Sequence, residues 1–93
     1  MSLPAKDLNL HCENIKNTED VQTLIIKYKN KHFLYKEKIY LFNSYRENEI
    51  FAQRRTILLN SFLEFNEKTN VLTEVNSLIH KITKNEFTCK KIN

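Results

Sequence analysis

The chain contains no glycine in its 93 residues, and this absence restricts the folds it can adopt. Average usage would place about six glycines in a chain of this length. Glycine supplies the positive φ of tight turns, helix ends and phosphate-cradling loops. The absence excludes the P-loop, the dinucleotide fingerprint, the EF-hand loop and the G-x-S-x-G elbow. It also disfavours a sheet of many strands with tight hairpins, so helices with few connections are expected.

Residues 17–42 carry the signals of a first helix. Asn17 or Thr18 can cap its start, and two acidic residues follow in the first turn. Apolar residues then recur at three- and four-residue steps, as a helix requires. They are Val21, Leu24, Ile25, Tyr28, Tyr35, Ile39 and Phe42.

An alternative for this region is a small β-hairpin at 24–42. Apolar and polar residues alternate around Tyr28 and again between Phe33 and Tyr35, and Asn30 could form the turn. β-Branched and aromatic residues are also enriched here, which favours strands. The helix is preferred because capping and the lack of glycine outweigh a short alternation.

Ser44 and Glu47 have the spacing of a capping box, which normally starts a helix. The chain is therefore expected to reverse near 43–44 and to form a second helix over 45–65. Apolar residues continue in a seven-residue phase through a helix near 70–84. The polar residues 66–70 could form a loop before this helix, or the second helix could run through them as one long helix. The residues in this phase are Phe51, Leu58, Phe65, Leu72 and Ile79.

These patterns together predict an all-α fold. It would be an antiparallel helical hairpin or a three-helix bundle with a coiled-coil-like heptad seam. The alternative is an α+β fold with the small hairpin at 24–42 followed by helices. Residues 1–16 are expected to be a flexible N-terminal arm, 17–84 a single helical domain, and 85–93 a basic C-terminal tail.

Arg54 lies in the middle of the apolar stripe on the predicted second helix, whereas Arg55 flanks it. A buried arginine is costly unless a carboxylate pairs with it. Arg54 is thus expected either to extend its head to solvent or to meet an acid across a helix interface. The predicted interface residues are Ile50, Phe51, Arg54, Leu58, Phe62, Phe65, Leu72 and Ile79.

The net charge of +4 raises the question of nucleic-acid binding. Lysines alternate with aromatic residues over 27–38, a composition that suits backbone tracking with base stacking. On a helix, however, the aromatics would be mostly core and the lysines solvated. The residues that a nucleic acid would contact are Lys27, Lys29, Lys31, Lys36 and Lys38.

No catalytic or metal-binding constellation is evident. Cys12 and Cys89 are far apart, and with His11 and His80 they match no compact zinc module. Two cysteines also make a poor disulfide framework, so their thiols are expected to be reduced in an intracellular, cytoplasmic protein. No apolar run is long enough to span a membrane. No enzymatic activity, cofactor, metal or small-molecule ligand is expected.

The predicted function is a non-enzymatic helical protein–protein interaction module, either a homo-oligomer or a small subunit of a larger assembly. Its basis is the surplus of apolar residues outside the main stripe, which two or three helices would leave exposed. One alternative is a small basic nucleic-acid-binding protein. Another is a small helical immunity, anti-host or export-chaperone protein, which rests on size and charge alone.

Overall fold

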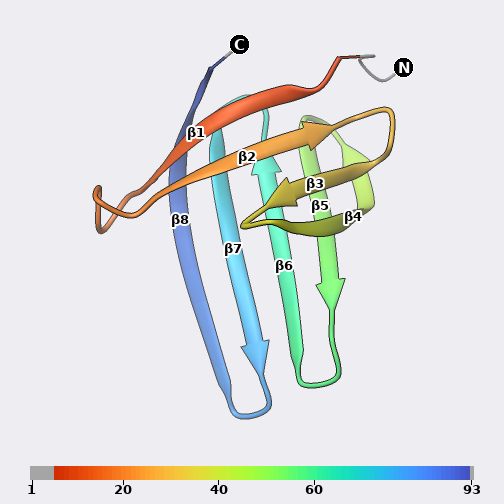
Figure 1. The fold of residues 1–93 in the computed structure, drawn as a ribbon, viewed down its shortest axis with the longest axis vertical. Helices are drawn as coiled ribbons and strands as arrows, with labels where there is room; N and C mark the ends of the chain where they lie inside the picture. The colour runs from red at the N-terminus through yellow and green to blue at the C-terminus, as the bar shows by residue number, and fades with distance from the viewer. Residues whose placement is uncertain (1–5, 93) are drawn as a thin grey trace.

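The computed structural model of the chain describes residues 6–92, which form eight strands and no helix. The first four strands are β1 (Leu8–Asn14), β2 (Val21–Lys27), β3 (His32–Tyr35) and β4 (Lys38–Arg46). The last four are β5 (Glu49–Arg55), β6 (Leu59–Asn66), β7 (Val71–Leu78) and β8 (Lys81–Lys91). Each strand pairs antiparallel with the next, and β1 pairs with β8, so the sheet closes into a barrel (Figure 1).

The predicted all-α fold is therefore wrong, and so are its helices over 18–42, 45–65 and 70–84 and its heptad seam. The α+β alternative is wrong too, because strands replace the helices that it placed after 42. Strands β2, β3 and β4 do occupy the region of its hairpin. A helical module, as predicted for the function, is incompatible with this barrel.

The local pattern that decides the fold has a period of two. In β6, Ser61, Leu63 and Phe65 are buried, whereas Phe62 between them is exposed. Successive side chains of a strand point to opposite faces, so every second residue reaches the interior. The seven-residue phase has a different origin: Phe65 and Leu72 are direct partners across the β6–β7 hairpin.

Charged residues and asparagine take the turn positions that glycine would usually occupy. Lys36 and Glu37 have φ values of 51° and 62° between β3 and β4. Glu47 and Asn48 have φ values of 51° and 70° between β4 and β5. Two consecutive positive φ values are the mark of the two-residue hairpin turn whose twist matches that of the strands. The predicted capping box is therefore wrong: Ser44 lies in β4, and Glu47 lies in a turn.

The barrel interior is filled by side chains, many of them aromatic. The ring centroids of Phe33 and Phe42 are 5.1 Å apart, and those of Tyr35 and Phe87 are 6.3 Å apart, both edge-to-face. Such pairs add to the stabilisation that comes from burial. The buried aromatic residues are Tyr28, Phe33, Tyr35, Tyr40, Phe65 and Phe87.

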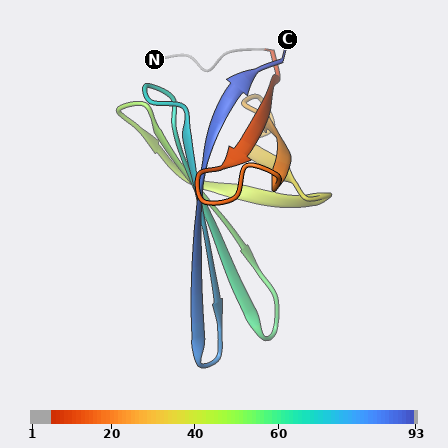
Figure 2. The same ribbon diagram turned by 90° about the vertical axis from the view of Figure 1, so that its left-hand side faces the viewer.

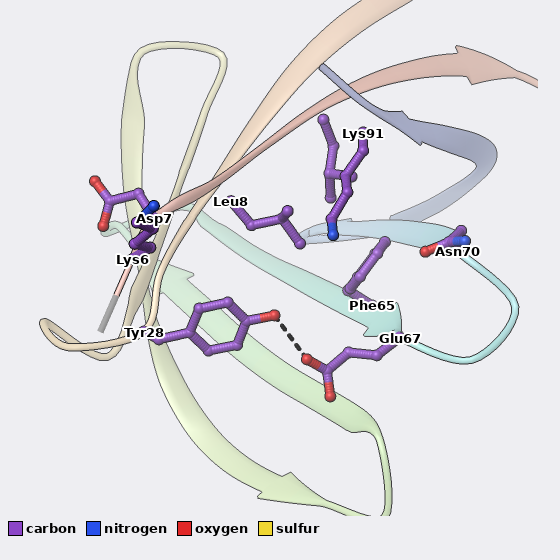
Figure 3. Close-up of a pocket in the computed structure, with 9 residues that line it drawn as sticks. Lys6, Asp7, Leu8, Tyr28, Phe65, Glu67, Asn70 and Lys91 are labelled. Carbon is purple, nitrogen blue, oxygen red and sulfur yellow. Dashed lines mark hydrogen bonds between the residues drawn. The ribbon is translucent and has the colours of Figure 1, made fainter. Parts of the chain in front are cut away.

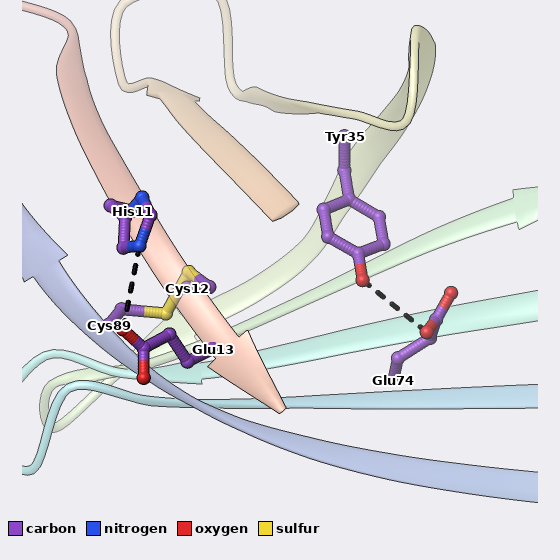
Figure 4. The surroundings of a disulfide bond; sticks show 6 residues. All are labelled: His11, Cys12, Glu13, Tyr35, Glu74 and Cys89. Atoms are coloured by element: carbon purple, nitrogen blue, oxygen red, sulfur yellow. Dashed lines mark hydrogen bonds and ion pairs between the residues drawn. A yellow bond between two sulfur atoms is a disulfide. The ribbon is translucent and has the colours of Figure 1, made fainter. Parts of the chain in front are cut away.

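A disulfide bond closes the seam between the first and the last strand. Cys12 of β1 lies directly opposite Cys89 of β8, and the bond joins residues 77 positions apart (Figure 4). The expectation of reduced thiols is wrong in this structure. Residues 8–14 and 85–91, expected in the arm and the tail, belong to β1 and β8. Residues 1–5 and 93 lie outside the described part of the chain.

Two hairpins extend beyond the closed barrel (Figure 2). The pairing of β4 with β5 ends at Leu41 and Gln53, and that of β1 with β8 ends at Asn14 and Phe87. Past these points only β5, β6, β7 and β8 continue, as a four-stranded sheet with two turns at its end. We call residues 53–61 and 75–85 the finger segments.

Candidate functional site

Aliphatic side chains are exposed at the ends of the finger segments. Ile57, in the turn between β5 and β6, is 100% exposed. Four further residues there are between 47% and 73% exposed. They are Leu58, Leu78, Ile79 and Ile82. Clusters of exposed apolar residues on a folded chain commonly mark an interaction site.

The finger segments also carry the whole formal net charge. They contain four permanent cations and no acidic residue. The chain has 15 basic and 11 acidic residues, so the rest of it is balanced and the fingers account for the +4. The four cations are Arg54, Arg55, Lys81 and Lys84. The exposed aliphatic tips therefore lie within a positive field, which favours negatively charged partners.

A recess of about 320 Å³ lies between the finger segments and the β3–β4 turn. Leu59 and Leu78 form apolar parts of its wall, and Ser61, Asn76 and Thr83 add polar groups. Three lysines also line it, Lys36, Lys38 and Lys81. The recess can thus accept a small apolar or acidic group that projects from a partner.

The buried carboxylate of Glu74 at the base of this recess is already satisfied. The Tyr35 hydroxyl donates to it at 3.4 Å (Figure 4), and the Lys36 ammonium lies 3.3 Å away. Burial, together with the charge of Glu74, raises the pKa of Tyr35 well above its usual range. Glu74 is 2% exposed and forms an ion pair with Lys36, so the net positive charge of the recess comes from Lys38 and Lys81.

The sheet of the finger segments has an open edge along β8. Residues 81–85 pair with β7 on one side. On the other side, the last β1 contact is the bond that the Ile15 backbone N–H donates to Glu86. Unpaired backbone groups of this kind are a template for another strand. Lys81 and Lys84 on the same edge are charges that discourage pairing with an identical edge.

A larger cavity of about 740 Å³ opens at the barrel mouth that faces away from the fingers (Figure 3). We call it the mouth pocket. Leu8, Leu10 and Phe65 give it an apolar floor and wall, and Tyr28, Glu67 and Lys91 are among its polar residues. Leu10, Tyr28 and Phe65 are almost fully buried, so the floor is part of the barrel core.

Two tyrosines hold the carboxylate of Glu67 in this pocket. The Tyr28 hydroxyl donates to Oε2 and the Tyr45 hydroxyl donates to Oε1, each at 2.6 Å. Burial and the bond to Glu67 raise the pKa of Tyr45 to about 12. The same two causes raise the pKa of Tyr28 still further. Both phenols consequently stay protonated and act as donors at physiological pH.

The predicted interface residues do not share one face, because the expected seam required a helical period. Ile50, Phe65 and Leu72 are buried in the barrel core. Phe51 and Phe62 lie on the outer face of β5 and β6, where they line a shallow hollow of about 280 Å³. Leu58 and Ile79 lie at the finger tips, and a partner-binding role for the exposed members stays a prediction.

Arg54 and Arg55 do differ in environment, but through a strand rather than a helix. Arg54 lies opposite the buried residue Ser61 in the β5–β6 pair. Burial and the charge of Glu74 raise the pKa of Tyr40, and the charge of Arg54 partly opposes this rise. Arg55 donates to the Asn60 side chain at 3.1 Å. Arg54 therefore belongs to the recess side of the fingers, and the interhelical acid expected for it does not exist.

The five predicted nucleic-acid contacts fall into two sets at opposite ends of β3. Lys27 pairs with Asp7 at 3.4 Å, close to Lys29 and Lys31 of the β2–β3 turn. Lys36 and Lys38 flank the β3–β4 turn and line the recess. The aromatic residues interleaved with them are buried in the core, so they cannot stack on bases.

The histidines do not gather around the cysteines. His11 lies 3.6 Å from the Glu13 carboxylate, and His80 lies at a finger tip. No group of three or more metal-ligating side chains is assembled within residues 6–92. The absence of enzymatic activity and the intracellular location stay predictions, and the second has lost the support of reduced thiols.

Helical interpretation missed most of the residues that form these sites. Leu78 has no role on the predicted helices, and Ile57, Ile82 and Tyr28 are assigned there to buried helical stripes. One signal was available: 53–61 and 75–85 both contain cations and aliphatic residues but no acidic or aromatic residue. The pairing of Glu67 with two tyrosines 39 and 22 positions away has no local signal.

Comparisons with protein-family models, curated proteins and solved structures find no match to this chain. Within the described residues, no helix is present that could cross a membrane.

Proposed function

We propose that this chain is a non-enzymatic protein-binding protein that docks its finger segments on an acidic partner. The observation that carries the proposal is the coincidence of two features on one protruding sheet. The five exposed aliphatic residues and the entire net positive charge both lie on the finger segments. The predicted protein partner is thus kept as a proposal, and its binding surface moves from a helical seam to the fingers.

The open edge of β8 supports an extended segment as the part of the partner that binds. Among the described residues, no strand pairs with 81–85 on the side away from β7, and an added strand would pair there. Lys81 and Lys84 favour acidic side chains on that strand, and Ile82 offers it an apolar contact. A projecting acidic side chain could enter the recess and meet Lys38 and Lys81, which line it beside the Lys36–Glu74 ion pair.

The same features disfavour three other occupants. A second copy would bring four further positive charges against the fingers, so self-association through this surface is opposed. A membrane interior cannot satisfy the unpaired backbone groups along 81–85. A nucleic acid finds no aromatic side chain in either finger segment on which to stack.

The test compares three variants in affinity capture from extracts of the source cells. One variant removes apolar contacts (Ile57→Ser with Ile82→Ser), and one removes charge (Lys81→Gln with Lys84→Gln). The matched control, Lys29→Gln with Lys31→Gln, removes two exposed lysines at the β2–β3 turn. A protein captured by the wild type and by the control is then purified and titrated against all four proteins.

We expect both finger variants to weaken the affinity for the purified partner by about tenfold or more, and the control to leave it unchanged. Binding should also weaken as salt rises, because the field of the fingers is screened. Equal affinity of all four proteins would overturn the proposal. So would finger-dependent binding to anionic vesicles or to oligonucleotides in place of a protein.

A further inference from the structure

The mouth pocket lies at the end of the barrel away from the fingers and takes no part in the proposed docking. Its volume of about 740 Å³ falls within the range of small-molecule sites, and barrel mouths are a common place for them. Its floor is apolar, because Leu10 and Phe65 reach it from the core. Nothing in the sequence indicates this pocket, since its residues come from four separate segments.

The carboxylate of Glu67 lines the pocket with a fixed orientation, and no cation of residues 6–92 lies within ion-pair distance of it. The Tyr28 and Tyr45 hydroxyls each bond one of its oxygens at 2.6 Å (Figure 3 shows the first). Each oxygen retains a further acceptor site for a donor from a ligand. Within residues 6–92 the ion pairs involve other carboxylates, so the charge of Glu67 is not neutralised.

A positive charge without a carboxylate partner lines the same pocket. Figure 3 shows the Lys91 ammonium directed into it, between Leu8 and Phe65. No carboxylate of the described residues lies within ion-pair distance of Lys91. Asp7 on the rim is occupied by Lys27 at 3.4 Å. Within residues 6–92, the pocket thus offers the anchored Glu67 carboxylate, the Lys91 ammonium without an ion-pair partner, and an apolar surface between them; Lys6 is a second lysine of its lining.

We propose that the mouth pocket binds a small amphiphilic zwitterion. The ligand's ammonium donates to Glu67, its carboxylate accepts from Lys91, and its apolar skeleton contacts Leu8, Leu10 and Phe65. A ligand with both charges meets both unpaired groups, whereas a simple amine or a simple acid leaves one charge uncompensated in a partly desolvated site. Because the two tyrosines already fix the Glu67 carboxylate, this side chain loses little conformational entropy when the ligand binds.

The experiment uses three probes with the same carbon chain: 6-aminohexanoate, hexylamine and hexanoate. Each is titrated into the full chain and followed by NMR chemical-shift changes at Leu10 and Phe65. We expect 6-aminohexanoate to bind about tenfold more tightly than either single-charge probe. Glu67→Gln should remove the advantage over hexanoate, and Lys91→Met should remove the advantage over hexylamine.

Lys91→Met also guards against a folding artefact, because Lys91 is exposed and makes no ion pair with a described residue. The variant Ile57→Ser with Ile82→Ser should bind 6-aminohexanoate as the wild type does, which separates this site from the fingers. Equal affinity for all three probes, or no shift at Leu10 and Phe65, would overturn the proposal. Wild-type affinity of the Lys91→Met variant for 6-aminohexanoate would do the same.

Discussion

The finger sheet continues four of the eight strands of the closed barrel, β5 to β8, but the two regions differ in what stabilises them. In the barrel, aromatic side chains fill the interior, and a disulfide joins β1 to β8. In the fingers, no aromatic residue is present, and aliphatic residues face solvent. Burial of apolar surface is the main stabilising contribution to folding. The barrel is therefore expected to contribute most of the free energy of unfolding. The finger residues contribute little to it and are available to bind a partner.

The strand β8 shows the change within eleven residues. Its first four residues, Lys81–Lys84, are exposed on both faces of the sheet. Its later residues Phe87 and Cys89 are buried, and β1 pairs alongside them. Regions with few buried contacts open locally at lower free energy than a core does. Side chains of a binding surface on such a region can therefore be substituted without loss of the fold.

The largest expected effect separates two phenylalanines of β6. Phe65 is 1% exposed and Phe62 is 38% exposed on the opposite face. Phe65→Ala should lower the free energy of unfolding by about 3 to 5 kcal/mol, because it leaves a cavity in the core. Phe62→Ala should cost about 1 kcal/mol or less. Urea unfolding of both variants measures the difference, and equal losses would contradict the division between the two faces.

The disulfide should have the next largest effect. The double variant Cys12→Ala with Cys89→Ala should lose about 2 to 4 kcal/mol of unfolding free energy, because the bond closes a long loop in the unfolded chain. The bond joins β1 to β8 across a separation of 77 residues. Addition of reductant should destabilise the wild type and leave the double variant unchanged. Insensitivity of the wild type to reductant would show that the seam does not depend on the bond.

The tyrosines of the mouth pocket should make the barrel sensitive to high pH. The pKa of Tyr45 is raised from 10.0 to about 12, so the folded state keeps this proton more strongly than the unfolded state does. The corresponding stabilisation is complete below pH 10 and is lost as the pH rises from 10 towards 12. Unfolding free energy should thus fall more steeply over this range in the wild type than in Tyr45→Phe. Identical slopes would mean that Tyr45 does not bond Glu67 in solution.

The absence of glycine misled the interpretation because the chain uses other residues at left-handed positions. Asparagine tolerates this conformation, but Lys36, Glu37 and Glu47 also adopt it here. Closure of the barrel supplies enough tertiary stabilisation to keep these three residues in the left-handed conformation. Local sequence patterns do not reveal that the sheet closes. The alternation in β3 and around Tyr28 was visible and correctly suggested strands, but it was given less weight than the turn argument.

Other parts of the fold and of the candidate sites had no signal within a single segment. The seven-residue repeat of five apolar positions from Phe51 to Ile79 fits a heptad, yet in the barrel Phe65 and Leu72 are partners across a hairpin. Glu74 is buried beside Tyr35 and Lys36, which lie 39 and 38 positions before it in the sequence, so no local pattern indicates this contact. The charge of the finger segments was readable from the sequence, whereas their protrusion was not.

A smaller effect tests the turn argument directly. Glu37 has a φ of 62° in a turn on the barrel side. Glu37→Gly should raise the free energy of unfolding by about 0.5 to 1 kcal/mol, because glycine adopts this conformation without the steric cost. The matched control, Thr23→Gly in the exposed part of β2, should lower it by a similar amount. Destabilisation by both changes would show that Glu37 does not adopt a left-handed conformation.

The smallest effect on stability is expected at the finger tips. Ile57 and Ile82 are 100% and 73% exposed, so little apolar surface is returned to water when they become polar. Ile57→Ser with Ile82→Ser should change the free energy of unfolding by no more than about 0.5 kcal/mol. The same variant should lose affinity for the acidic partner, so stability and recognition are predicted to separate. A clear drop in unfolding free energy would instead show that the tips pack on the molecule, and the fingers would then be structural parts of the barrel.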